Sequence, residues 1–146
     1  IVNYINMGLD IDTLINALDN DDNAKLMKLD YTSVKKMKND MLQRLGLSRE
    51  VLVKYHKSLK HYRYIDEIPD IKFGSYVRWV PLTNPDNIKL TNGGVVCDVK
   101  IGNDVSVLCR NRNNLVFEFK MAKCLVFQKL SEEERVLLSA MEYLNK

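Results

Sequence analysis

Two periods of hydrophobic spacing divide the chain. From residue 10 to residue 64, apolar side chains recur every three or four positions, which predicts helices. After Pro69 they alternate with polar side chains in short runs, which predicts strands. The end of the chain returns to helical spacing. We therefore expect a basic helical region at 1–68, a small β-barrel at 69–130 and a capping helix at 131–146.

The helical region is predicted to hold three helices. The first follows from apolar residues on one helical face, Ile11, Leu14, Ile15 and Leu18. The second begins near Thr32 or Ser33 and ends at Gly46, a residue type that favours the left-handed cap. Ser48 caps the third, and its buried stripe is expected to be Leu52, Tyr55, Leu59 and Tyr62. The short link between the last two helices predicts a helical hairpin.

Five short strands are predicted from period-two alternation, at 73–82, 95–101, 105–110, 115–121 and 124–130. Turn residues such as Asn, Gly, Asp and Pro separate these runs. Five strands in so short a segment favour a small antiparallel barrel, either SH3-like or OB-like. The capping box formed by Ser131 and Glu134 predicts the start of a C-terminal helix. The expected fold class is therefore α+β.

Alternation along the strands also predicts where individual side chains face. Tyr76 and Trp79 are three residues apart, so one is expected in the core and the other on the surface. Phe117 and Phe119 share a face, and the core is their expected location. The three cysteines, Cys97, Cys109 and Cys124, show no metal-binding spacing, and the first two fall on apolar faces where thiols pack as small hydrophobes.

Charge adds the main functional cue. The chain has 46% hydrophobic and 28% charged residues, which excludes disorder over its whole length, and its net charge is only +3. That total conceals a segment at 21–64 with 11 basic and 5 acidic residues. Such a cluster suits phosphate backbones, because neutralising each phosphate releases counterions. A plain solvated helix face and an acidic protein partner are the alternatives.

No pattern for catalysis or for a cofactor is found. An acidic run resembles a calcium loop at Asp19, Asp21 and Asn23, but Ala24 stands where glycine is needed and Asp30 where a glutamate is usual. We expect no metal, no cofactor, no enzymatic activity and no membrane partner, since no apolar run approaches the length of a bilayer span.

The strands and turns from KFGSYVRWV through VVCDVKI to LVFEFKMAKCLVFQKL resemble the small SH3-like barrels of uncharacterised proteins from nucleocytoplasmic large DNA viruses, including mimivirus-like ones. The high content of Asn, Lys and Asp in this chain also resembles that of proteins encoded by the AT-rich genomes of these viruses. The resemblance covers about 60 residues, carries no catalytic residue, and implies a viral protein of the host cytoplasm or the virion.

Two functions follow as hypotheses. The first is a non-enzymatic module that binds DNA, RNA or a nucleic-acid-handling complex. Its expected contact residues are Lys54, Lys57, Lys60, His61 and Arg63 on or after the third helix, with Arg78, Arg110 and Arg112 on the barrel. The second is a structural or assembly protein, such as a minor virion component or complex subunit, that contacts a viral protein partner through an apolar patch or an open sheet edge.

Overall fold

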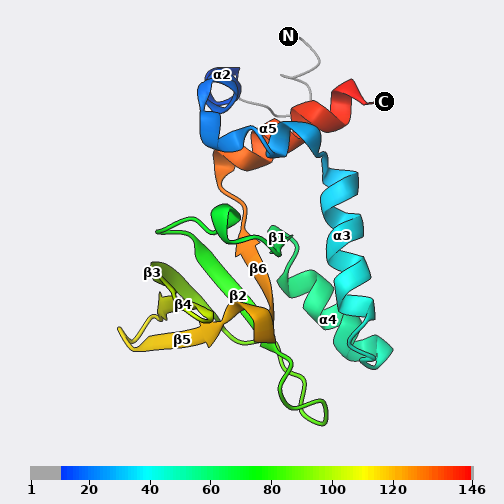
Figure 1. Cartoon of the computed structure of the whole chain (residues 1–146). Helices are drawn as coiled ribbons and strands as arrows, with labels where there is room; N and C mark the ends of the chain where they lie inside the picture. Colours follow the sequence, from blue (N-terminus) through cyan, green and yellow to red (C-terminus); the bar gives the residue numbers. More distant parts are fainter. Residues whose placement is uncertain (1–10, 146) are drawn as a thin grey trace. The chain divides into compact units, whose positions relative to one another are not determined.

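The computed structural model describes residues 11–145 as a mixed α+β chain (Figure 1). Its helices are α2 (Ile11–Asp19), α3 (Tyr31–Gln43), α4 (Arg49–Ser58) and α5 (Glu132–Leu144). Its strands are β1 (Tyr62–Ile65), β2 (Tyr76–Pro81), β3 (Gly94–Ile101), β4 (Val105–Arg110), β5 (Val116–Lys120) and β6 (Cys124–Lys129). The α+β class and the C-terminal helix are confirmed.

Contacts group the described chain into two compact units. The helical unit comprises residues 11–37 and 130–145, and the sheet unit comprises residues 38–129. The division falls inside α3, so α3 contributes its first half to one unit and its second half to the other.

The helical unit has a small core of its own. It is built on Leu14 and Ala17 of α2, Val34 of α3, and Leu137 of α5, all buried. The buried face of α2 differs from the predicted one: Leu14 and Ala17 are buried, whereas Ile15, predicted on the apolar face, is 50% exposed. The capping box at the start of α5 is confirmed, with the side chains of Ser131 and Glu134 each accepting a hydrogen bond from the other's backbone N–H.

The hairpin of α3 and α4 forms largely as predicted. Gly46 has φ +64°, the left-handed conformation expected after a helix. Ser48 caps α4 and accepts a hydrogen bond from the N–H of Val51. Helix α3 begins slightly early, at Tyr31, because the carboxylate of Asp30 accepts a 2.8 Å hydrogen bond from the N–H of Ser33 and serves as the cap.

The expected five-stranded barrel is wrong in two respects. The sheet has six antiparallel strands in the order β1-β6-β2-β3-β4-β5, and it is open, since β1 and β5 are its two edges. The missed strand is β1. Helix α4 ends at Ser58, and Tyr62, expected on the helix stripe, instead begins a strand that pairs with β6.

The open sheet nevertheless curls strongly. Three strand spacings separate β2 from β5, about 14 Å in a flat sheet. Yet Trp79 of β2 stacks on Phe119 of β5 with ring centroids 4.3 Å apart. Trp79 and Phe119 are buried together with Val77, Val107 and Val126 on the concave side of the sheet. Tyr76 and Trp79 were expected on opposite faces, and the structure buries Trp79 in the core and leaves Tyr76 half-buried on the other face.

A β-bulge explains the main error in side-chain facing. The pairing of β3 with β4 shifts between Val96 and Asp98, so Cys97 is an extra residue in its strand. The bulge turns Val96 inward and leaves Cys97 exposed, against the prediction of an apolar face. Phe117, also expected in the core, is 45% exposed near the outer edge of the sheet.

The other face of the sheet is covered in part by helices. Leu42 of α3 and Leu59, which follows α4, pack against Val80 of β2 and against Leu125 and Phe127 of β6. Arg78 and Tyr76 lie two and four residues before Val80, so they share its face of the sheet. That face carries the candidate site.

Candidate functional site

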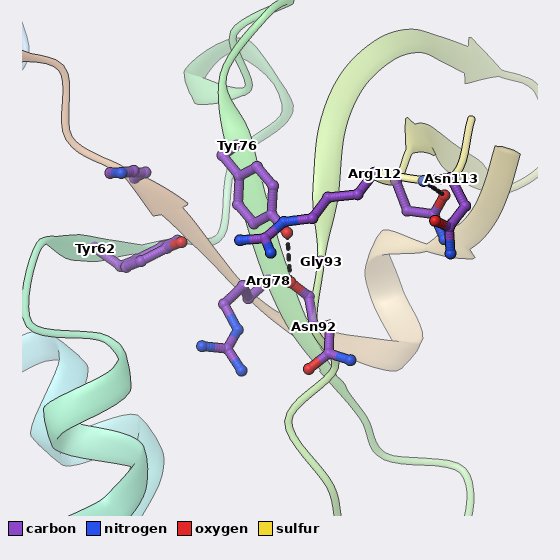
Figure 2. Close-up of a pocket in the computed structure, with 9 residues that line it drawn as sticks. Tyr62, Tyr76, Arg78, Asn92, Gly93, Arg112 and Asn113 are labelled. Atoms are coloured by element: carbon purple, nitrogen blue, oxygen red, sulfur yellow. Dashed lines mark hydrogen bonds between the residues drawn. The ribbon is translucent and has the colours of Figure 1, made fainter. Parts of the chain in front are cut away.

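A cavity of about 650 Å³ opens on the sheet unit (Figure 2). Residues of strands β1, β2 and β6 line the cavity, together with the loop before β3 and the turn between β4 and β5. The lining residues are Tyr62, Tyr76, Arg78, Asn92, Gly93, Asn111, Arg112, Asn113 and Lys129. Three of these nine are cations, two are tyrosines, three are asparagines and none is acidic. We call this the Arg112 cavity.

Strand register brings the floor of the cavity together. Tyr62 of β1 pairs directly with Lys129 of β6. On the other side of β6, Val77 pairs with Gln128, which in an antiparallel ladder places Tyr76 next to Lys129. Tyr62, Lys129 and Tyr76 thus form a row across three adjacent strands, and Arg78 lies two residues along β2 on the same face.

Hydrogen bonds fix two of the cavity side chains. The hydroxyl of Tyr76 donates to the carbonyl of Asn92 over 2.7 Å (Figure 2). The Nε of Arg78 donates to the carbonyl of Thr91 over 2.8 Å. Among the bonds found in residues 11–145, this is the only one made by the Arg78 side chain, so its two outer nitrogens remain available to a ligand.

The remaining walls come from two turns. Asn111 holds the β4–β5 turn, since its side-chain oxygen accepts hydrogen bonds from the N–H groups of Asn113 and Leu115. This turn presents Arg112, and Figure 2 shows its side chain reaching across toward Tyr76 and Arg78. Gly93, from the loop before β3, has φ +83° and lies directly against the side chains of Tyr76 and Arg78.

The electrostatics of the cavity favour an anion. Burial raises the pKa of Tyr62, and the nearby positive charge of Arg78 acts in the opposite direction. With three cations and no carboxylate lining it, the cavity carries an uncompensated positive charge. Arginine guanidinium groups and asparagine amides can donate several hydrogen bonds to phosphate oxygens.

The basic residues predicted on the barrel separate into two groups. Arg78 and Arg112 both line the cavity. Arg110 ends β4, paired with Val116, and does not belong to the lining residues. Arg110 and Arg112 are both exposed.

The basic residues predicted on the third helix are also divided. Lys54 and Lys57 are exposed on α4. Lys60 is exposed and His61 is half-buried, but both follow the end of the helix and lie in the turn before β1. Arg63 is only 6% exposed. Its side chain lies on the opposite side of β1 from Tyr62, so it does not join the cavity or a surface with the lysines.

Sequence reasoning missed Tyr62, Lys129 and the asparagines of the cavity. Tyr62 was assigned to a helix stripe, so its place on a sheet could not be inferred. Lys129 near the end of the last strand gave no signal alone, because its neighbours come from strands about 50 and 70 positions earlier. The Asn-rich turns at 92 and 111–113 were identified only as turns.

The cysteines and other titratable groups form no second site in the described part of the chain. Burial raises the pKa of Cys109 to about 12 and that of Cys124 to about 11, so both thiols stay protonated at neutral pH. Within residues 11–145, no three His, Cys, Asp or Glu side chains are placed to hold a metal ion together. No described helix combines the length and apolar character needed to cross a membrane.

Comparisons with protein-family models, with curated proteins and with solved structures find no match to this chain.

Proposed function

We propose that the protein is a non-enzymatic module that binds nucleic acid through the Arg112 cavity. The observation that carries the proposal is the composition of that cavity, which combines three cations, two tyrosines and three asparagines without an acidic side chain. Phosphates account for most of the affinity of proteins for nucleic acids, and they require cations that are not neutralised by nearby carboxylates. Aromatic rings and amides add contacts to bases.

The exposed lysines on and just after α4 are included in the proposed contact surface. Helix α4 leads through Lys60 and His61 into β1, whose first residue, Tyr62, lines the cavity (Figure 1). Lys54, Lys57 and Lys60 are exposed and supply further cations close in the chain to the cavity. The buried Arg63 is left out of the surface.

Two arginines at one turn allow a matched test. Arg112→Gln is expected to weaken binding of a labelled single-stranded DNA about fivefold in fluorescence anisotropy, the size of one charged phosphate contact of about 1 kcal/mol. Arg110→Gln removes the same charge two residues away but outside the cavity, and it is expected to change the affinity less than twofold. Equal losses for both variants would show that only net charge matters and would contradict a binding site in the cavity.

The alternative function is a structural or assembly protein, and one observation favours it. Edge strand β5 and the residue before it expose three apolar side chains, Leu115, Val116 and Phe117, next to backbone groups that no neighbouring strand pairs on that side. This edge offers a protein contact, but it lacks the charge and the concave shape of the Arg112 cavity. Nucleic-acid binding is therefore the proposal that more of the described residues support.

The viral origin implied by the sequence resemblance, and with it a place in the host cytoplasm or the virion, stays a prediction. The proposed nucleic-acid binding does not depend on it, because the cations and tyrosines of the cavity suit DNA or RNA of any source.

A further inference from the structure

We infer that the Arg112 cavity takes one unpaired nucleotide, with its base on Tyr62 and its phosphate on the arginines, so that the protein prefers single strands to duplexes. The inference rests on the proposed function and narrows its ligand class. It follows from the shape of the cavity, from the position of the two tyrosines and from the presence of both amides and cations in its walls.

The cavity has the dimensions of a pocket for one small ligand. Its volume of about 650 Å³ lies within the usual range for such sites. Tyr62 and Tyr76 stand on the two strands that flank β6, so their Cα atoms are about 10 Å apart, two strand spacings. Lys129 of β6 lies in the same row between them, so a base does not enter between the two rings and instead stacks on the face of one of them. A base pair inside a duplex cannot stack in this way, because both of its faces are already covered by its neighbours.

Tyr62 packs in part against the hydrophobic cluster beneath α3 and α4, and the remaining face of its ring is the one best placed to stack on a base. Tyr76 is tied to the carbonyl of Asn92 through its hydroxyl and serves as a fixed wall. The Tyr62 hydroxyl has no hydrogen bond within the described residues, and Figure 2 shows the side chain extending from β1 toward the same space that Arg78 faces. Stacking on an aromatic ring does not depend on base identity, since every base offers a π-face.

The cavity walls supply amides suited to a base edge and cations suited to a phosphate. The side chains of Asn92 and Asn113 each present a donor and an acceptor, the combination that base edges require. The guanidinium groups of Arg78 and Arg112 both face the space between these asparagines and Tyr62 (Figure 2). A nucleotide whose base lies on Tyr62 can therefore place its phosphate within reach of both arginines.

The test compares three labelled DNA probes of one sequence: a single strand, its duplex, and a single strand in which abasic sites replace the bases. We expect the wild-type protein to bind the intact single strand about tenfold more tightly than either of the others in anisotropy titrations. The abasic strand keeps every phosphate, so its weaker binding isolates the contribution of the bases.

Two variants assign this preference to the cavity. Tyr62→Leu is expected to remove the preference for the intact single strand over the abasic one, and Tyr62→Phe, which keeps the ring, is expected to retain it. Phe73→Leu is the matched control, because Phe73 is 67% exposed and lies outside the cavity. Its replacement should leave all three affinities unchanged.

The outcomes separate the inference from the proposed function. Equal, salt-sensitive binding of all three probes would overturn the unpaired-nucleotide inference and leave nucleic-acid binding intact. No binding to any probe at low salt would contradict both. A preference for intact single strands that Tyr62→Leu does not change would place the base elsewhere and would also overturn the inference.

Discussion

Replacing Gly93 by alanine is expected to destabilise the sheet unit by about 3 kcal/mol. The added Cβ would lie 2.1 Å from the carbonyl oxygen of Val77, a backbone atom that cannot move without breaking the β2–β3 pairing. The φ of +83° adds a strain of about 1 kcal/mol or more for any L side chain. Overpacking of this kind typically costs about 1–3 kcal/mol in addition.

Gly74→Ala is the matched control for Gly93→Ala. Gly74 has nearly the same φ, +85°, but a Cβ there would meet no atom within 4 Å. Its replacement should therefore cost only the conformational strain, about 1–2 kcal/mol. Guanidinium unfolding followed by the fluorescence of Trp79 measures both, because Trp79 is the single tryptophan of the chain and is buried in the sheet unit. Equal losses for the two variants would contradict the close approach at Gly93.

Lys38→Met is expected to lower the free energy of unfolding of the sheet unit by about 3 kcal/mol. Lys38 is 4% exposed, and its ammonium donates hydrogen bonds of 2.8 Å to the carbonyl of Leu59 and 3.0 Å to that of Tyr62. It thus ties α3 to the carbonyl end of α4 and to the start of β1, where a positive charge also suits the helix dipole. Methionine has a similar length but leaves these buried carbonyls without their partner.

The control for Lys38→Met is Lys54→Met, at an exposed position of α4 within the same sheet unit. Surface substitutions of this kind usually change stability by less than about 0.5 kcal/mol. Trp79 fluorescence again reports the unfolding of the sheet unit. A loss for Lys38→Met as small as that for Lys54→Met would show that its hydrogen bonds do not stabilise the contact between α3, α4 and β1.

Local signals predicted the elements that local chemistry determines. Gly46 and Ser48 were correctly read as the end of one helix and the start of the next, and Ser131 with Glu134 as the start of α5, because caps act over a few residues. Strand β4 was predicted with its observed bounds, since its alternation is uninterrupted.

The errors occurred where distant residues decide the structure. Tyr62 was predicted on the stripe of the third helix, and only the pairing of residues 62–65 with β6, more than 60 positions later, makes them a strand. The bulge at Cys97 changes which side chains of β3 face the core. The alternating sequence does not predict it, because no residue in the run signals that one position will be unpaired. The sequence likewise identifies Arg78 and Arg112 as candidate contact residues. It does not predict that they line one cavity with Tyr62 and Lys129, because that depends on the pairing of distant strands.

The salt dependence of binding tests the central claim most directly. The measurement compares the wild-type protein with the triple variant Arg78→Gln, Arg112→Gln, Lys129→Gln on one single-stranded DNA over a range of salt concentrations. Each lost phosphate contact lowers the slope of log affinity against log salt by about 0.7. If the cavity binds phosphates through all three cations, the slope should become shallower by about 2. An unchanged slope, or an absence of binding by the wild-type protein at low salt, would contradict nucleic-acid binding in the Arg112 cavity.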